Sequence, residues 1–218
     1  LLEDCAHAVG TLHKKKHVGN FGNSGSFSFY PTKQITTGEG GAIITNNRKF
    51  YEKIKTLKAF GIDKDIKDRK KQGDYDVIEL GYNYRMTDFQ ASLGYHQLLR
   101  YNLNLKKRHA IVKRYIKNLS KKNKIKHMPY SSDCSYFVFQ IFSKNRDSLL
   151  KKLKKNKIGV SVHYLNCVPS MTYYKKKYDL KIKNFQNAKV YGDTNISLPV
   201  YPKLTFSEVD KICKIISS

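Results

Sequence analysis

The stretch FSFYPTKQITTGEGGAI, residues Phe27–Ile43, holds the first candidate for a reactive side chain in this chain. An apolar run that contains Ser28 is followed closely by Lys33. A lysine at the end of a buried strand loses its proton more easily than a lysine in water, and it then becomes a nucleophile toward an aldehyde. Taken alone, this pattern has little weight, because lysine and arginine together number 42 in the chain.

Short apolar runs near the N-terminal end predict the strands of an α/β sheet that is buried on both faces. These runs are Leu1–Glu3, Ser26–Tyr30 and Gly41–Thr45. Asp4 follows the first run, at the carboxyl end of a strand, where open α/β sheets place their sites. Its carboxylate could keep a ring nitrogen protonated or could cap a helix. Glycines 38, 40 and 41 permit positive φ and close backbone approach, although a plain hairpin or bulge is the favoured local interpretation.

Apolar spacing predicts where the helices and the remaining strands lie. The expected helices cover residues 48–60 (ended by Gly61), 105–119, 147–155 and 208–216 (capped by Ser207). A further helix, capped by Thr87 or Asp88, is expected to run through Ala91 and Leu99. Residues 62–78 read as a long surface loop, and residues 136–142 and 159–164 read as strands. We expect two domains, residues 1–104 and 105–218.

The formal charge of +25 raises the question of nucleic-acid binding. The excess is mostly lysine and is spread over the whole length, which favours a solvated surface. A basic nucleic-acid-binding protein remains a distant alternative, which steeply salt-dependent binding would favour.

The composition also indicates where the protein works. There is no apolar run of about 18 residues, and therefore no expected membrane span. No signal peptide is recognised. The four cysteines lack metal-ligand spacing and read as free thiols in a reducing cytoplasm. Because the chain starts with Leu1 inside an apolar run, we expect residue 1 to lie within a longer protein.

Several blocks, taken in order, carry a family resemblance. They are EDCAHAVG (3–10), FGNSGSFSFYPTKQITTGEGGAIITN (21–46), LGYNYRMTDFQASLGYHQL (80–98), GVSVHY (159–164), YYKKKY (173–178) and ISLPVYPKLTFSEVDKI (196–212). Together they resemble the DegT/DnrJ/StrS group of nucleotide-sugar aminotransferases, over essentially the whole chain. The resemblance implies fold type I, with part of a large mixed-sheet domain followed by a smaller α/β domain. It also implies that the N-terminal part of the family's length is missing.

The resemblance assigns roles to particular residues. Lys33 looks like the lysine that bonds to pyridoxal 5'-phosphate, and Asp4 looks like the partner of its pyridine nitrogen. His7 matches a position beside the cofactor ring, and Ser28 looks like a phosphate ligand. Asn83 is similar to an asparagine that reaches the phosphate in the neighbouring subunit of a homodimer.

The resemblance also implies the reaction and its substrates. His163 and Tyr164 match a pair near the sugar-nucleotide pocket, although Leu165, Asn166 and Cys167 depart from the family pattern after that pair. The implied activity is transfer of an amino group, with glutamate as the expected donor, to a nucleotide-linked keto-sugar in a composite dimer site. No metal, nucleic acid or membrane partner is expected. A catalytically inactive or regulatory relative that binds the cofactor is the alternative, and the intact Lys33 argues against it.

Overall fold

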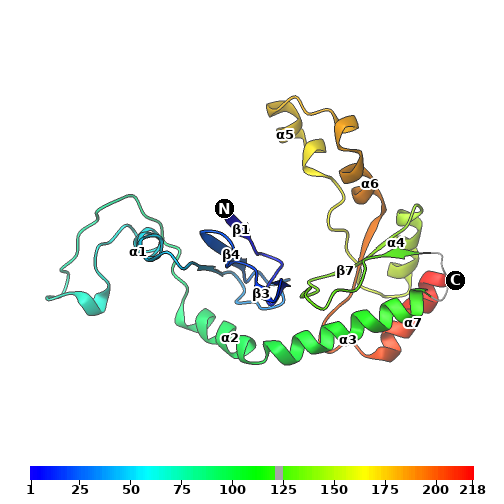
Figure 1. The fold of residues 1–218 in the computed structure, drawn as a ribbon, viewed down its shortest axis with the longest axis horizontal. Coiled ribbons are helices and arrows are strands. Elements are labelled where there is room, and N and C mark those ends of the chain that lie inside the picture. The colour runs from blue at the N-terminus through cyan, green and yellow to red at the C-terminus, as the bar shows by residue number, and fades with distance from the viewer. Residues whose placement is uncertain (121–124) are drawn as a thin grey trace. The chain divides into compact units, whose positions relative to one another are not determined.

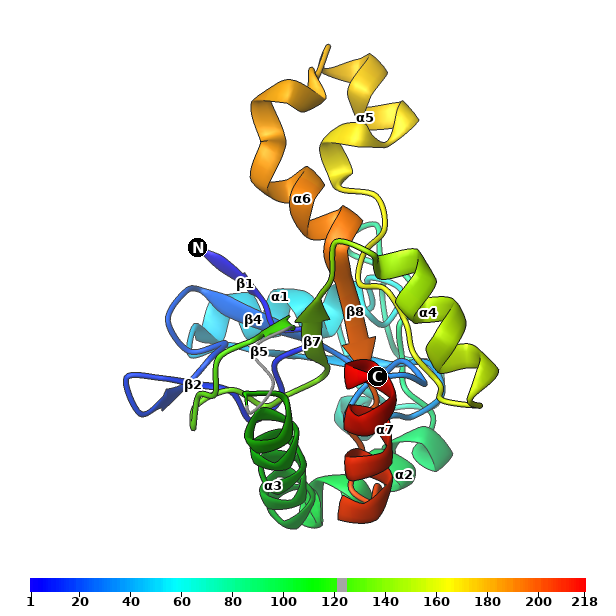
Figure 2. The same ribbon diagram turned by 90° about the vertical axis from the view of Figure 1, so that its right-hand side faces the viewer.

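The computed structural model describes residues 1–120 and 125–218 of the chain. By their internal contacts these residues form two compact units, Leu1–Asn102 and Leu103–Ser218. Figures 1 and 2 trace the elements of the first unit in blue to green and those of the second unit in green to red.

The first unit is built on a mixed three-stranded sheet. Strands β1 (Leu2–Asp4), β4 (Ser24–Ser28) and β5 (Gly41–Ile44) lie in the order β1-β4-β5. Strands β1 and β4 are parallel, whereas β4 and β5 are antiparallel. The predicted strands are confirmed, with β4 starting two residues earlier than expected. Their expected burial on both faces is wrong for this chain, since Leu2 on β1 and Ile43 on β5 are exposed. A two-stranded ribbon, β2 (Leu12–His13) with β3 (Lys16–His17), connects β1 to β4.

Two helices of the first unit begin at side-chain caps. Helix α1 (Arg48–Leu57) starts after Asn47, whose side chain accepts a hydrogen bond from the Phe50 amide. Helix α2 (Asp88–Leu99) starts with a capping box between Thr87 and Gln90. Helix α1 ends earlier than predicted, because the chain turns with positive φ at Phe60 and Gly61. The expected loop at 62–78 contains one short 3-10 turn, η1 (Ile66–Asp68).

The second unit has its own antiparallel sheet and its own core. The sheet order is β6 (Lys126–His127), β7 (Phe139–Phe142), β8 (Asn195–Leu198). Helices α3 (Tyr101–Ser120), α4 (Arg146–Lys155) and α7 (Phe206–Ser217) supply most of the helical core residues, and α4 packs against both α7 and β8 (Figure 2). The buried core includes Ile111, Val112, Tyr115, Leu119, Phe139, Ile141, Leu153, Ile196, Leu198, Val209 and Ile212.

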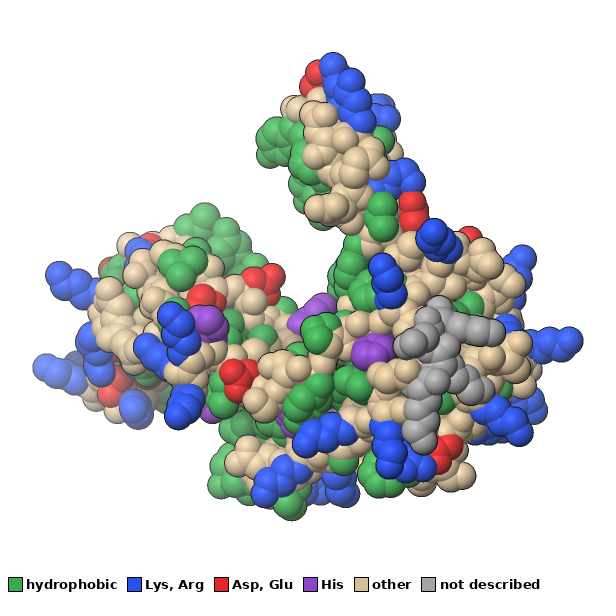
Figure 3. Space-filling model, turned by 45° about the vertical axis from the view of Figure 1, so that its right-hand side comes forward, with side chains coloured by type: hydrophobic (Ala, Val, Ile, Leu, Met, Phe, Trp, Pro, Cys, Tyr) green, Lys and Arg blue, Asp and Glu red, His purple; other side chains and the backbone are tan. Residues whose placement is uncertain are grey.

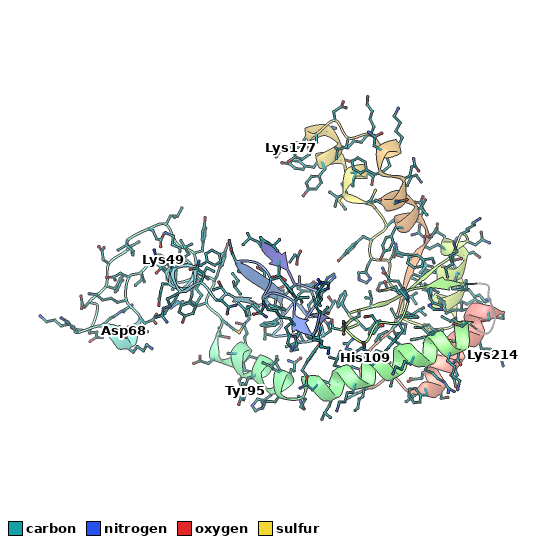
Figure 4. The ribbon with its side chains drawn as sticks, viewed as in Figure 1. Lys49, Asp68, Tyr95, His109, Lys177 and Lys214 are labelled. Atoms are coloured by element: carbon teal, nitrogen blue, oxygen red, sulfur yellow. The ribbon has the colours of Figure 1, made fainter. Side chains whose placement is uncertain are left out.

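Histidine 109 belongs to this packing. Figure 4 labels it on α3, and its Nδ1 lies 3.2 Å from the Tyr130 hydroxyl. Its ring also meets the Tyr136 ring edge-on at 5.2 Å. Burial and the neighbouring Lys113 lower the pKa of His109. The neutral ring therefore packs as an aromatic side chain.

The remaining helical segments follow the predicted strand at 159–164. They are η2 (Val168–Ser170), α5 (Thr172–Lys177), η3 (Ile182–Phe185) and α6 (Gln186–Thr194). Figure 1 shows α5 and α6 projecting away from the sheet of the second unit. Lys177 stands on this projection (Figure 4), and its Nζ donates to the Tyr173 hydroxyl over 3.1 Å.

Two expectations for the second unit were wrong. Residues 159–164 do not form a strand, since only Ser161 makes a β-bridge, to Ser197. The ladder stops there because the amide of His163 donates instead to the side chain of Asn195. The closing helix is capped by Thr205 and not by Ser207. A capping box needs its hydroxyl three residues before the glutamate, and Thr205 has that spacing from Glu208.

The surface of the described residues agrees with the dispersed charge of the sequence. On the face drawn in Figure 3, lysine and arginine side chains are scattered among apolar and neutral groups. Within residues 1–120 and 125–218, no helix combines the length and apolar character required to cross a bilayer.

A charged cluster joins α3 to α7 in the second unit. Arg114 donates to both carboxylate oxygens of Asp210, over 2.7 and 2.5 Å, and Asn118 donates to Oδ1 over 2.6 Å. The hydrogen bonds from Arg114 and Asn118 lower the pKa of Asp210 from 3.8 to about 2. The folded state therefore binds this proton more weakly than the unfolded state, and the cluster stabilises the fold above pH 3.8.

We predict that Asp210→Asn lowers the melting temperature at neutral pH. The difference from the wild type should shrink as the pH falls from the ordinary pKa of 3.8 to about 2, where the wild-type carboxylate is protonated as well. Thermal unfolding across this range measures the effect, with the exposed Asp179→Asn as the matched control. A difference that does not vary with pH would contradict the prediction.

Candidate functional site

The pairing of β1 with β4 brings two of the predicted site residues, Asp4 and Ser28, to one edge of the sheet. The strands are parallel and in register, with Leu2 opposite Ser24 and Asp4 opposite Ser26. Asp4 ends β1 and Ser28 ends β4. Because parallel strands share their carboxyl ends, both side chains lie at the edge where α/β sheets bind ligands.

Asp4 begins a turn and does not cap a helix. Its Oδ1 accepts a hydrogen bond from the Ala6 amide over 3.0 Å. The residues that follow form turns, and the Asp4 side chain is exposed. Of the two interpretations of Asp4, the helix cap is therefore wrong, and its carboxylate remains accessible to a ligand.

Lys33 lies in the turn that follows β4. Its amide donates to the Tyr30 carbonyl over 2.9 Å, and its side chain is half-buried. Burial lowers the pKa of the Lys33 ammonium group below its ordinary value, and the negative charge of Asp4 opposes that shift. A lysine that deprotonates readily beside a carboxylate is suited to nucleophilic and proton-transfer chemistry.

Ser28 and His7 flank the same turn. The Ser28 hydroxyl oxygen accepts from the Tyr30 amide over 3.3 Å. The His7 carbonyl accepts from the side chain of Gln34 over 3.4 Å. Gln34, the residue after Lys33, is thus hydrogen-bonded to the turn after β1. This contact brings the segment of Lys33 and Ser28 close to the segment of Asp4 and His7.

The glycine-rich segment after Lys33 forms the tight turn that enters β5. Gly38 and Gly40 have φ values of 79° and 150°. Gly41 pairs with Ser28, and a Cβ on Gly41 would lie 2.6 Å from the Phe27 carbonyl oxygen. The hairpin interpretation of these glycines is confirmed, and the turn packs tightly beside the end of β4.

Two glutamines of α2 support this loop, and neither was predicted from the sequence. The Gln97 side chain accepts from the Thr36 amide over 3.1 Å and donates to the Thr36 carbonyl over 2.6 Å. Gln90 donates to the Glu39 carbonyl over 2.9 Å. Residues seven apart share a helix face, so that spacing was the available signal.

We predict that Gln97→Ala lowers the free energy of unfolding of the full-length protein by about 1–3 kcal/mol, since two backbone groups of Thr36 lose a partner. Urea unfolding measures the change. Gln72→Ala, at an exposed position of the surface loop, is the matched control and should have no effect. Equal stability of the two variants would show that α2 does not hold the loop.

Asn83 lies in a separate segment of the first unit. Its side-chain oxygen accepts from Arg85 over 3.3 Å, and its backbone bridges to Ala59. The Arg85 guanidinium lies over the Phe60 ring, 4.8 Å from its centre. The Asn83 side chain is exposed. Its role toward a neighbouring subunit stays a prediction.

His163 and Tyr164 belong to the second unit. The half-buried His163 ring approaches the Ser197 hydroxyl, with 2.8 Å between Nδ1 and Oγ. The Tyr164 ring is exposed and meets the His163 ring edge-on at 5.3 Å. Their role toward a sugar nucleotide also stays a prediction.

The side chains of the described residues show no candidate metal centre. Within residues 1–120 and 125–218, no three histidine, cysteine, aspartate or glutamate side chains gather as metal ligands. The four cysteines are free thiols, as expected. Burial raises the pKa of the thiols of Cys5, Cys134 and Cys213, which makes them poor nucleophiles.

Solved structures with the same fold are aminotransferases. The chain superposes on Helicobacter pylori PseC, an aminotransferase involved in the biosynthesis of pseudoaminic acid, with a TM-score of 0.90 and 26% identity over 99% of this chain and 58% of that one. It superposes equally well on the PMP form of Spr1654 from Streptococcus pneumoniae, described as a sugar aminotransferase, with a TM-score of 0.90 and 29% identity. This superposition covers 99% of this chain and 57% of that one. The architecture is therefore that of the fold type I pyridoxal-phosphate enzymes, as predicted.

The sequence narrows this class to a family. Residues 1–217 match the DegT/DnrJ/EryC1/StrS aminotransferase family, and the chain belongs to it. It is 39% identical to protein MJ1066 of Methanocaldococcus jannaschii, over 96% of this chain and 57% of that protein. It is 35% identical to the UDP-4-amino-4,6-dideoxy-N-acetyl-beta-L-altrosamine transaminase of Campylobacter jejuni, over 95% of this chain and 55% of that protein. The chain thus spans little more than half the length of these relatives.

Proposed function

We propose that the full-length protein is a pyridoxal-phosphate-dependent aminotransferase that converts a nucleotide-linked keto-sugar into an amino-sugar. The observation that carries the proposal is Lys33, a half-buried lysine whose pKa is lowered by burial and which feels the charge of Asp4. Family membership supports the same activity. In this proposal, residues 1–104 are the C-terminal half of the cofactor-binding domain and residues 105–218 are the small domain.

The residues at the sheet edge fit the cofactor. Pyridoxal phosphate, when bound, supplies an electron sink for the charge that develops on the amino donor. Lys33 offers an amine for the aldehyde, Asp4 an exposed carboxylate for the ring nitrogen, and Ser28 a hydroxyl at a strand end for the phosphate.

Each residue then has a distinct task. Asp4 would hold a proton on the ring nitrogen, because a nearby anion favours the charged form. Lys33 would move a proton between Cα of the amino donor and C4′ of the cofactor, as a general acid and base. His7 would lie beside the ring, and Asn83 would serve the site of a second subunit in a homodimer.

Names of relatives support the substrate class. The Campylobacter relative is named for a UDP-linked dideoxy amino-sugar. A 34% identical relative in Bacillus subtilis is the spore coat polysaccharide biosynthesis protein SpsC. We assign glutamate as the donor, the cytoplasm as the location, and His163 and Tyr164 as residues that contact the sugar nucleotide.

Borohydride trapping tests the proposal. The full-length protein, loaded with pyridoxal phosphate and reduced with sodium borohydride, should carry a pyridoxyl group on Lys33 in a peptide mass map. Lys33→Ala should lose the label and lower turnover of glutamate with a UDP-keto-sugar by about 10²–10⁴-fold. The control is Lys49→Ala, at an exposed position on α1 (Figure 4).

The outcomes separate the competing functions. A wild-type label on Lys33 with turnover establishes the aminotransferase. A label without turnover of any donor and keto-sugar supports the inactive, cofactor-binding relative. Labels scattered over surface lysines would contradict the proposed site.

A further inference from the structure

Two side chains of the second unit hold the backbone of His163. Its amide donates to Oδ1 of Asn195 over 3.0 Å, and its carbonyl accepts from Nε2 of Gln140 over 3.0 Å. Asn195 begins β8 and Gln140 lies on β7. Both peptide groups that flank the His163 side chain are therefore fixed to neighbouring strands of one sheet.

The His163 ring is fixed as well. Its Nδ1 lies 2.8 Å from the Ser197 hydroxyl oxygen. The Phe137 ring meets it edge-on, with 5.8 Å between the centroids. The side chain is only half-buried, so the contacts orient a ring that keeps access to solvent.

Further hydrogen bonds hold the side chains that contact His163. The Tyr191 hydroxyl of α6 donates to Oε1 of Gln140. The Asn195 amide group donates to the Tyr191 carbonyl over 2.8 Å. Asn195, Ser197 and Gln140 are 0%, 4% and 5% exposed. Burying such polar groups is costly unless each is bonded, and a fully bonded buried network is rigid.

The Ser197 side chain is not needed to attach the segment around Ser161 to the sheet. The backbones of Ser161 and Ser197 already bond to each other in both directions, over 3.2 and 2.8 Å. An alanine at position 197 would preserve these bonds. What the hydroxyl adds is its contact with the His163 ring.

We infer that Ser197, with Asn195 and Gln140, is a positioning residue that orients His163 to bind the diphosphate or sugar of a nucleotide-sugar substrate. The inference rests on the proposed function and extends it to the residues behind the ligand contact. The hydrogen bond between the Ser197 hydroxyl and Nδ1 of His163 fixes the plane of the imidazole ring, whichever of the two groups donates. The fixed ring plane in turn sets the direction from which the ring meets the ligand.

The test uses UDP-N-acetylglucosamine as the probe and the full-length protein loaded with pyridoxal phosphate. Ser197→Ala should raise the Kd for the probe about fivefold or more, the equivalent of one lost hydrogen bond. It should also change the ring ¹⁵N shifts of His163, which report the hydrogen bond at Nδ1. His163→Ala should weaken binding at least as much.

The matched control is Ser161→Ala, which removes an exposed hydroxyl from the residue paired with Ser197. It should leave both the Kd and the His163 shifts unchanged. If Ser197→Ala lowers the melting temperature, Ser197→Cys keeps the side-chain volume with a weaker donor and carries the same expectation.

The readouts distinguish this inference from the proposed function. Wild-type affinity and wild-type His163 shifts in folded Ser197→Ala overturn the positioning role. Wild-type affinity in His163→Ala overturns the ligand contact itself. Borohydride labelling of Lys33 remains an independent measure, so loss of that label in the wild type overturns the aminotransferase while the His163 shifts still report on Ser197.

Discussion

The parallel pairing of β1 with β4 is the constraint on which the rest of the candidate site depends. It places the ends of two strands, and with them Asp4 and Ser28, at one edge of the sheet. Glu3 stabilises the approach to this pairing, because its carboxylate accepts hydrogen bonds from the amides of Gly19, Phe21 and Gly22. Partial burial acts to raise the pKa of Glu3, but these bonds outweigh it and lower the pKa below its ordinary value. The carboxylate thus stays charged and holds the loop that leads into β4.

The turn that carries Lys33 depends on contacts from farther along the chain. The backbone of Thr36 and Glu39 is held by Gln97 and Gln90 of α2, and a capping box at Thr87 and Gln90 fixes where that helix begins. The role proposed for Lys33 needs a defined position as well as a lowered pKa, since a small displacement from the reacting atoms costs much of the rate. Helix α2 therefore supports the candidate site through its contacts with the backbone of this turn.

The sequence predicted local features more successfully than long-range ones. Helices were expected at 48–60, through Ala91 to Leu99, and at 147–155, and they form at 48–57, 88–99 and 146–155. They could be predicted because apolar spacing is a property of neighbouring positions. The strand expected at 159–164 was wrong because side chains from β7 and β8 replace its ladder. Asp4 and Lys33 could be chosen from strand ends and family motifs. Gln97 could not be matched to its partner, because the contact with Thr36 spans 61 positions. The seven-residue spacing from Gln90 indicates a shared helix face without indicating what that face contacts.

The hydrogen-bonded side chains around His163 could serve the stability of the sheet or the orientation of His163. Buried apolar residues of similar volume would often stabilise a sheet as well as the hydrogen-bonded amides of Asn195 and Gln140 do. What an apolar core cannot supply is direction: each amide of this network bonds through both its oxygen and its nitrogen, to specified partners. One orientation of the network, and hence of the His163 peptide groups, satisfies all these bonds together. A fully buried asparagine next to a half-buried histidine is therefore better explained by orientation of the ring than by stability of the core.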